Sequence, residues 1–143
     1  GGADIPVEEA LMHVWGYGAG IDLTRRDLQA KAKDMGRPWD LAKGFDFSAP
    51  CSPLVPVADC GHPEKGRISL SVNGELRQDG DLADQIWPVA DIIAILSQSV
   101  ELKPGDLIFT GTPAGVAAVN PGDRLEGEIK GVATIAVSVG ARP

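Results

Sequence analysis

The pattern of apolar and polar residues along this chain predicts three helices, and two of them have apolar residues at helical spacing. Residues 4–14 place apolar side chains at helical intervals around a proline, with two glutamates in the expected first turn. A second helix is expected over residues 24–35, because Thr24 and Asp27 have the spacing of a capping box and a glycine follows the segment. A third apolar stripe opens on a proline and predicts a helix over residues 88–100.

The segments between these helices carry strand and turn signals. Residues 16–21 alternate glycine with larger residues, which is typical of a strand whose backbone approaches another backbone or a ligand closely. Residues 47–63 contain four prolines among short apolar pairs and suit an irregular connection with edge strands. Asn73 and Gly74 supply the positive φ angles of a type I′ turn, so a hairpin is expected around them. The strands expected in the second half cover residues 68–72, 75–78, 107–110, 124–129 and 132–139. The predicted fold class is α+β, mostly β.

Composition places the chain among ordinary globular proteins. Its 143 residues are 43% hydrophobic and 23% charged, which suits one domain with a packed core, and residues 1–143 are expected to form one domain. No apolar run is long enough for a membrane span, and no signal peptide is visible. The net charge is −7 and the basic residues are scattered, which argues against nucleic acid as a partner. Cys51 and Cys60 lack metal-site spacing and are expected to be free thiols in a reducing cytoplasm.

The stretch between residues 22 and 43 contains a carboxylate, a guanidinium, an amide and an ammonium. If Thr24 caps a helix, Asp22, Arg26 and Gln29 share one face, and such a face could hold a cation and an anion together. Each residue also has a plainer interpretation. Asp22 could be a solvated cap, and Lys43 could be an ordinary surface lysine. Arg26 could form a surface ion pair, and Gln29 could be an exposed amide.

Residues 110–115 read Thr-Gly-Thr-Pro-Ala-Gly and follow an expected strand. Their glycines would let backbone N–H groups and the Thr110 hydroxyl approach a ligand closely, although the same residues suit a tight structural turn. The segment lacks the lysine of a phosphate-binding loop, and residues 16–20 lack dinucleotide-binding spacing, so nucleotide binding is not expected. Structural or solvent-facing roles are expected for His13, His62, Glu126 and Glu128.

Four motifs in a fixed order resemble the signature of the fumarylacetoacetate hydrolase family. They are Ile-Asp at 21–22, Arg-Asp-Leu-Gln at 26–29, Leu-Ala-Lys at 41–43 and Thr-Gly-Thr-Pro-Ala-Gly at 110–115. Each motif is weak alone, but their order makes the resemblance specific, and it covers almost the whole chain. Residues 36–43 resemble the branch of fumarylpyruvate and acylpyruvate hydrolases.

The resemblance implies a mixed β-roll with a few short helices and a divalent metal, Mg²⁺ or Mn²⁺, as cofactor. The aspartate at the position of Asp22 is a metal ligand in these enzymes. Lys43 would be the catalytic residue, because its charge would stabilise an enolate or a carboxylate. Arg26 and Gln29 would bind the carboxylate and a carbonyl of the substrate, and Thr110 would add a further substrate contact.

The implied reaction is hydrolysis of the carbon–carbon bond of an acylpyruvate, with fumarylpyruvate giving fumarate and pyruvate as the first choice. The implied partners are a small-molecule diketo acid and a second copy of the chain in a homodimer. Two enzymatic alternatives on the same fold stay open: an isomerase or decarboxylase of hydroxymuconate-type acids, and an oxaloacetate decarboxylase. A non-catalytic dimerisation fragment is the alternative of another class.

The family completes its metal site with a Glu-x-Glu pair and takes its general-base His and Glu from a mobile segment. Both precede the region that resembles this chain. We therefore expect residues 1–143 to be the C-terminal portion of a longer catalytic domain, without its N-terminal lid and Glu-x-Glu strand.

Overall fold

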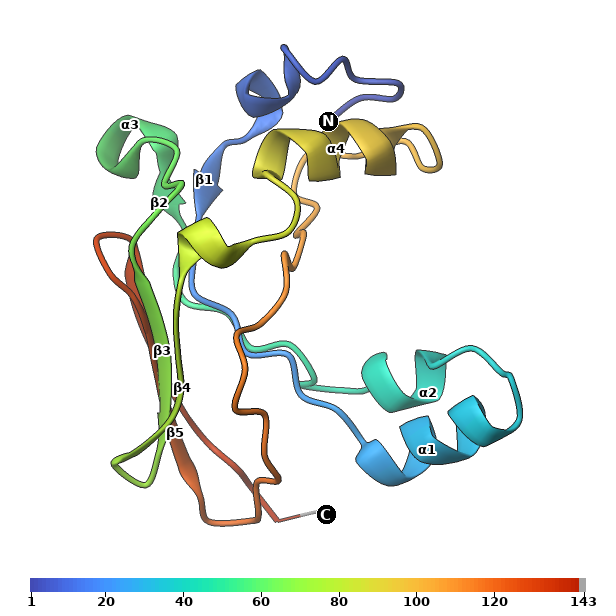
Figure 1. The fold of residues 1–143 in the computed structure, drawn as a ribbon, viewed down its shortest axis with the longest axis vertical. Coiled ribbons are helices and arrows are strands. Elements are labelled where there is room, and N and C mark those ends of the chain that lie inside the picture. Colours follow the sequence, from blue (N-terminus) through green and yellow to red (C-terminus); the bar gives the residue numbers. More distant parts are fainter. Residues whose placement is uncertain (142–143) are drawn as a thin grey trace.

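The computed structural model describes residues 1–141 and contains a four-stranded sheet, a two-stranded pair and short helices (Figure 1). The strands are β1 (Gly16–Tyr17), β2 (Val55–Pro56), β3 (Arg67–Val72), β4 (Glu75–Asp81), β5 (Arg124–Ile129) and β6 (Ala133–Ser138). The helices are η1 (Ala10–His13), α1 (Arg26–Asp34), α2 (Asp40–Lys43), α3 (Val57–Cys60), η2 (Leu82–Asp84) and α4 (Val89–Ser97). The α+β class predicted from the sequence is confirmed.

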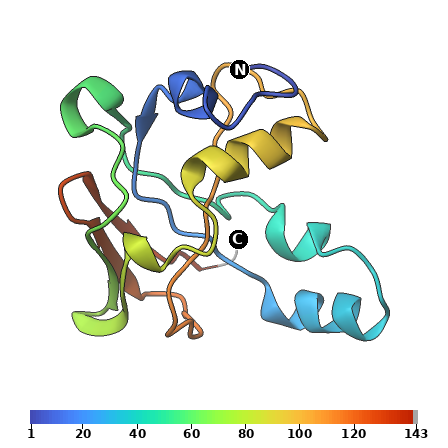
Figure 2. The ribbon, with the colours of Figure 1, turned by 45° about the horizontal axis from the view of Figure 1, so that its top comes forward.

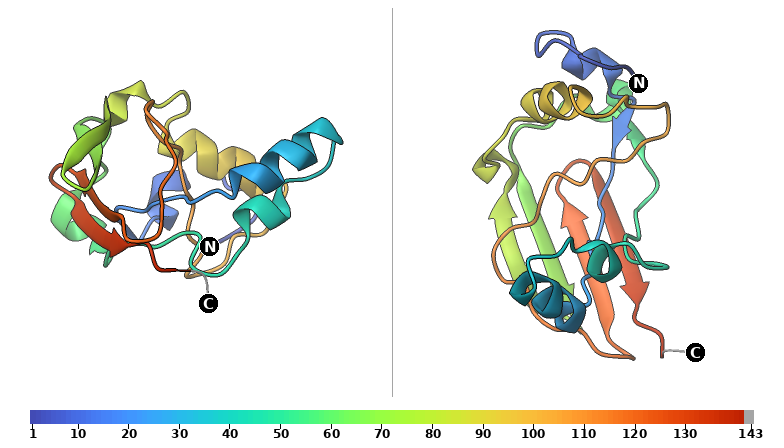
Figure 3. Two further views of the ribbon diagram at one scale, coloured as in Figure 1. Left: turned by 90° about the horizontal axis from the view of Figure 1, so that it is seen from below. Right: turned by 90° about the vertical axis from the view of Figure 1, so that its right-hand side faces the viewer.

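The main sheet has the strand order β4-β3-β5-β6, and every neighbouring pair is antiparallel. Figure 3 shows the strands side by side in its right-hand view. The predicted hairpin is confirmed, because Asn73 and Gly74 join β3 to β4 with φ angles of 53° and 81°. The strands predicted over residues 124–129 and 132–139 are confirmed as β5 and β6.

One face of the sheet is apolar, and it packs on the chain segment that leads to α1. Leu125 is 1% exposed and Ile135 is 8% exposed, and both belong to a buried cluster with Ile21. Because side chains alternate along a strand, Glu126 and Glu128 of β5 project from the opposite face, where both are exposed. The solvent-facing interpretation of these two glutamates is confirmed.

A second apolar cluster lies beneath α4. Ile93 of α4 packs there with Ile5 and Leu102, which come from the two chain segments next to the helix. The helix predicted over residues 88–100 is confirmed as α4, and Figure 2 shows η1 beside it. No helix within residues 1–141 has the length and apolar composition needed to cross a membrane.

The helix predicted over residues 24–35 is present as α1, but its predicted start is wrong. Arg25, not Thr24, is the N-cap residue, and its side chain makes no capping hydrogen bond. The N–H of Arg25 donates instead to the Ala42 carbonyl at 3.0 Å, which ties this residue to α2 before the helix begins. The predicted capping box therefore does not form.

The helix predicted over residues 4–14 is wrong in type and length, because only the short 3-10 helix η1 forms there. The backbone N–H groups of Asp4 and Ile5 donate to Ser97 of α4, to its carbonyl at 3.0 Å and to its hydroxyl at 2.9 Å. These contacts fix the segment against α4 in a non-helical path. The strand predicted over residues 107–110 is also wrong, since no strand within residues 1–141 pairs with it.

The close backbone approach predicted for residues 16–21 is confirmed, although only β1 is a regular strand. A Cβ atom on Gly16 would overlap the Val55 carbonyl of the paired strand. A Cβ atom on Gly20 would lie 2.6 Å from the Phe109 ring, so the ring rests directly on the glycine backbone. These contacts hold together three segments that are far apart in the sequence.

Candidate active site

Asp22 lies on an extended segment that runs beside the chain following α2. The Ile21 N–H donates to the Pro50 carbonyl at 3.0 Å, and the Leu23 N–H donates to the Ser48 carbonyl at 2.8 Å. Figure 1 shows the two segments side by side between the sheet and the helices α1 and α2. Ile21 is buried in the core of the sheet, whereas Asp22 is exposed. The backbone thus places one carboxylate at the edge of the core.

Lys43, the last residue of α2, reaches Asp22 because α2 is fixed against the start of α1. Ala42 is only 1% exposed, and its carbonyl accepts the hydrogen bond from the Arg25 N–H. The Arg25 guanidinium lies 4.3 Å from the centre of the Phe45 ring, a cation–π contact at the same corner. The Lys43 Nζ then donates to the Asp22 Oδ2 at 2.7 Å.

The Asp22–Lys43 pair remains accessible to solvent and to a ligand. The side chain of Lys43 is 37% exposed and that of Asp22 is 48% exposed. An ion pair with this exposure contributes little to folding, because water screens it. The pair nevertheless places the positive charge of Lys43 next to the Asp22 carboxylate. A substrate oxygen bound near Asp22 would therefore lie close to the Lys43 ammonium group.

A second pair of candidate residues lies on the first turns of α1. Arg26 Nη1 donates to the Gln29 Oε1 at 2.9 Å. Because the amide oxygen of Gln29 faces Arg26, its NH₂ group and the other guanidinium N–H groups are the donors that this pair offers to an anion. The prediction that Asp22 shares a helical face with these residues is wrong, because α1 begins four positions after it. The structure instead forms two separate pairs, Asp22 with Lys43 and Arg26 with Gln29.

Thr110 belongs to a third group of residues, beside the strand β4 and the connection that follows it. Its hydroxyl accepts a hydrogen bond from the Gln85 Nε2 at 2.9 Å. Two residues further along, Gln78 Nε2 donates to the Thr112 hydroxyl and to the Pro113 carbonyl, each at 2.7 Å. Sequence reasoning assigned Gln78 to the hairpin alone and gave Gln85 no role, because a glutamine in a polar stretch carries no signal of the segment it will contact.

Among the candidate residues, Asp22 is suited to be one ligand of a divalent cation. Mg²⁺ and Mn²⁺ bind several oxygen ligands, and the Asp22 carboxylate supplies a hard oxygen at an accessible position. Within residues 1–141, no three His, Cys, Asp or Glu side chains gather into a metal site. Glu126 and Glu128 do not complete the site, since they project from the polar face of the sheet and Ile21 packs on the other face.

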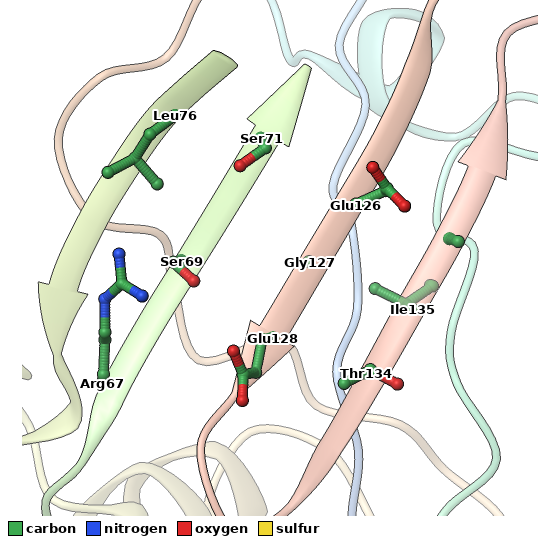
Figure 4. Close-up of a pocket in the computed structure, with 10 residues that line it drawn as sticks. Arg67, Ser69, Ser71, Leu76, Glu126, Gly127, Glu128, Thr134 and Ile135 are labelled. Atoms are coloured by element: carbon green, nitrogen blue, oxygen red, sulfur yellow. The ribbon is translucent and has the colours of Figure 1, made fainter. Parts of the chain in front are cut away.

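The polar face of the sheet carries a shallow depression of about 540 Å³ that holds none of the predicted site residues. Figure 4 shows its side chains standing on neighbouring strands, with Arg67 on β3 and Glu126 and Glu128 on β5. Arg67 Nε donates to Asp79 at 2.7 Å, and this hydrogen bond lowers the pKa of the Asp79 carboxyl. The depression is an open sheet surface, and it lacks converging groups for catalysis.

Both histidines join chain segments, in keeping with the structural roles expected of them. His13 Nδ1 donates to the Gly1 carbonyl at 2.7 Å. His62 Nδ1 and the Tyr17 hydroxyl lie 2.7 Å apart in a hydrogen bond, and the two rings meet edge to face. Burial, with a smaller contribution from Cys60, raises the pKa of Tyr17. Cys51 and Cys60 are free thiols, as predicted.

Comparison with known proteins identifies the family. The model of the fumarylacetoacetate hydrolase C-terminal domain matches residues 1–140. The chain is 45% identical to a fumarylpyruvate hydrolase from a Ralstonia species over 139 residues, which are 97% of this chain and 72% of the relative. It is 49% identical to an oxaloacetate tautomerase from Escherichia coli over 119 residues, which are 82% of this chain and 54% of the relative.

A solved structure agrees with this assignment. The fumarylpyruvate hydrolase from Pseudomonas aeruginosa, crystallised in complex with Mn²⁺ and pyruvate, superimposes with a TM-score of 0.96 at 52% sequence identity. The match covers 99% of this chain and 61% of that one, so the chain matches between 54% and 72% of the length of these three proteins. Because the family model covers nearly all of the sequence and the relatives share both sequence and fold with it, the chain belongs to the fumarylacetoacetate hydrolase family.

Proposed function

We propose that the full-length protein is a divalent-metal-dependent hydrolase that cleaves the carbon–carbon bond of an acylpyruvate, with fumarylpyruvate as its substrate. The observation that carries the proposal is the 2.7 Å contact between Lys43 and Asp22, which places a fixed cation beside an exposed carboxylate. Two relatives support the substrate class, since both the Ralstonia and the Pseudomonas proteins are fumarylpyruvate hydrolases.

In this proposal Asp22 is one ligand of Mg²⁺ or Mn²⁺, and the remaining ligands come from the part of the family domain beyond this chain's span. A cation bound there would act as a Lewis acid and draw electron density from the oxygens of a 1,3-diketo acid. The Pseudomonas structure with Mn²⁺ and pyruvate supports this choice of cofactor. The base that activates water would come from the same part of the domain.

Lys43 is the proposed catalytic residue of this chain. When the carbon–carbon bond breaks, negative charge moves onto the oxygen of the departing pyruvate unit, and the ammonium group beside Asp22 is placed to stabilise that charge. Lysine suits this role because its charge is compact and three N–H donors can turn toward the developing anion.

Arg26, Gln29 and Thr110 are the proposed substrate-binding residues. The guanidinium of Arg26 and the amide NH₂ of Gln29 offer donors to the substrate carboxylate and a carbonyl. The Thr110 hydroxyl accepts from Gln85, so its own hydrogen is available for a substrate oxygen. These groups bind and orient the substrate, whereas Asp22 and Lys43 act where the charge changes.

The experiment is a measurement of acylpyruvate consumption by the full-length protein, with Mn²⁺ or Mg²⁺ added and then removed by chelation. The proposal expects metal-dependent loss of the fumarylpyruvate absorbance, and Asp22→Asn should weaken Mn²⁺ binding followed by the electron paramagnetic resonance signal of the free ion. Asp34→Asn is the matched control, since Asp34 is an exposed carboxylate at the end of α1. Turnover that is unaffected by chelation would contradict the proposal.

Tautomerisation of oxaloacetate is a second candidate function, favoured by the 49% identity to the Escherichia coli enzyme. A tautomerase moves a proton between carbon and oxygen and cleaves no carbon–carbon bond. The two functions therefore differ in their products, and an assay that identifies products separates them. We further propose that the protein works as a cytoplasmic homodimer, and sedimentation velocity of the full-length protein tests its oligomeric state.

A further inference from the structure

We infer that Gln78 of β4 is a positioning residue that fixes residues 110–115 so that Thr110 faces the substrate. The inference rests on the proposed function for the substrate contact, whereas the anchoring of the segment rests on the contacts described below. Gln78 does not touch Thr110, so it acts through the backbone that connects them.

The segment that carries Thr110 needs an anchor of this kind. Among the residues that the structure describes, no backbone–backbone hydrogen bond joins residues 107–118 to any other part of the chain. Figure 3 shows this segment passing along the side of the sheet without joining it as a strand. Its path must therefore be set by side chains, because the backbone alone supplies no ladder to hold it.

Gln78 supplies two hydrogen bonds to this segment from a buried position. Its side-chain nitrogen donates to the Thr112 hydroxyl and to the Pro113 carbonyl, each at 2.7 Å, and the residue is 8% exposed. A carbonyl oxygen can only accept a hydrogen bond, so the amide of Gln78 must present its NH₂ group here. The contact therefore depends on a donor that neither a glutamate nor a methionine would provide.

Two glycines show that the same segment lies directly on β4. A Cβ atom on Gly115, which has a φ angle of 99°, would overlap the Arg77 carbonyl. A Cβ atom on Gly80 would lie 2.9 Å from the side chain of Pro113. The chain thus presses against β4 on both sides of the Gln78 contact, and only glycine leaves room for it.

The start of the segment has its own contact, since the Gln85 side chain holds the Thr110 hydroxyl. Two glutamines thus fix the segment at successive points. Gln85, in the connection between η2 and α4, holds residue 110, and Gln78 of β4 holds residues 112–113. Loss of the Gln78 contacts would free the backbone just after Thr110 and let its hydroxyl leave the orientation in which it meets a substrate.

The test compares Gln78→Glu and Gln78→Met with wild type in the full-length protein, with Gln98→Met as the matched control. Gln98 is an exposed glutamine that follows α4 as its C-cap residue. The first readout is the backbone order parameter S², from nuclear magnetic resonance relaxation, of the amides of residues 111–117 other than Pro113. We expect S² to fall from about 0.85 to below about 0.6 in both Gln78 variants, since the two hydrogen bonds that fix the segment are lost. The control should be unchanged.

A gentler pair of variants keeps the test informative if the Gln78 variants fold poorly. Thr112→Val removes one acceptor and keeps the shape of the side chain, whereas Thr112→Ser keeps the hydroxyl. We expect lower order parameters for the segment in Thr112→Val and wild-type order parameters in Thr112→Ser. Equal order parameters in wild type, Thr112→Val and every soluble Gln78 variant would overturn the anchoring.

The second readout is steady-state kinetics with the acylpyruvate. A positioning role raises KM about tenfold with kcat within about twofold, because a binding contact is lost. General destabilisation of the protein would instead lower the fraction of active enzyme and leave KM unchanged. An unchanged KM in Gln78 variants whose segment is loosened would overturn the positioning role. If wild type does not consume acylpyruvates but the order parameters change as expected, the proposed function and the role toward this substrate fail, whereas the anchoring of the segment by Gln78 stands.

Discussion

Replacement of Lys43 by methionine should abolish most of the activity of the full-length protein and leave its stability almost unchanged. The Lys43 Nζ and the Asp22 Oδ2 are 2.7 Å apart, and the two side chains are 37% and 48% exposed. Coulomb's law at this separation gives about 1.5 kcal/mol in water. The cost of ordering two flexible side chains and the screening by salt reduce the net value to about 0.2 to 1 kcal/mol.

The catalytic effect should be much larger, because the charge acts on a transition state. Loss of a group that stabilises a developing negative charge typically lowers kcat by about 10² to 10³, which corresponds to roughly 3 to 4 kcal/mol. We therefore predict that Lys43→Met lowers kcat strongly and changes the free energy of unfolding only slightly. Lys33→Met, which removes an exposed lysine near the end of α1, should change neither quantity.

The assay is a double-mutant cycle with Asp22→Asn, Lys43→Met and the double variant. Urea denaturation without divalent cations gives the coupling free energy of the pair, and acylpyruvate turnover gives the catalytic effect. A coupling energy above about 3 kcal/mol would mean that the pair is a structural ion pair of the buried type. Turnover by Lys43→Met at near the wild-type rate would refute the catalytic role of this residue.

Three further predictions follow from the described contacts. Leu125→Ala should lower the free energy of unfolding by about 3 to 5 kcal/mol in urea denaturation, because Leu125 is the large side chain buried to below 2% exposure; a loss under about 1 kcal/mol would contradict its place in the core. Gly115→Ala should destabilise the protein by about 1 to 3 kcal/mol in the same assay, because its positive φ and the adjacent β4 carbonyl leave no room for a Cβ, and an unchanged midpoint would argue against this packing. The Asp123 carboxylate accepts hydrogen bonds from the Asn120 N–H and the Asn73 amide, which lower its pKa below the ordinary value of 3.8. Its stabilising effect is present above that pH and disappears as pH falls through the lowered pKa, so the melting temperatures of wild type and Asp123→Ala should differ at neutral pH and converge as pH falls through that pKa. A difference in melting temperature that stays constant with pH would contradict this assignment.

The elements that the sequence predicted best are those whose signals are local. The Asn73–Gly74 turn requires two positive φ angles, and these residues adopt them at low cost, so the hairpin follows from the sequence. The helix α4 follows from its apolar residues and from Pro88 at its N-cap. The glycines at positions 16 and 20 correctly indicated close backbone contact, although the sequence did not show which segments would fill the space.

The errors arose where distant contacts decide the local structure. The start of α1 depends on a hydrogen bond from Arg25 to Ala42, which overrides the capping preference of Thr24. Residues 107–110 have a strand-like sequence but no strand partner within residues 1–141, so they follow the side chains of β4 and the connection after it. Propensity cannot report either effect, because the partner lies far away along the chain.

The sequence named the candidate site residues but did not predict how they are arranged. The motifs pointed to Asp22 and Lys43, and the structure brings these two side chains together through α2. The sequence placed Asp22 on one helical face with Arg26, whereas the structure pairs Arg26 with Gln29 and leaves Asp22 outside α1. The two glutamines that hold residues 110–115 could be found only from the folded chain.

The most direct test of the central proposal is product analysis by proton nuclear magnetic resonance. The full-length protein would be incubated with fumarylpyruvate and Mn²⁺, and in a parallel sample with oxaloacetate and Mn²⁺. The proposed function predicts equal amounts of fumarate and pyruvate from the first sample, neither product in the chelated control, and only a small fraction of both in the same time with Lys43→Met. Intact fumarylpyruvate, together with rapid interconversion of the keto and enol forms of oxaloacetate, would contradict the hydrolase and assign the site to tautomerisation.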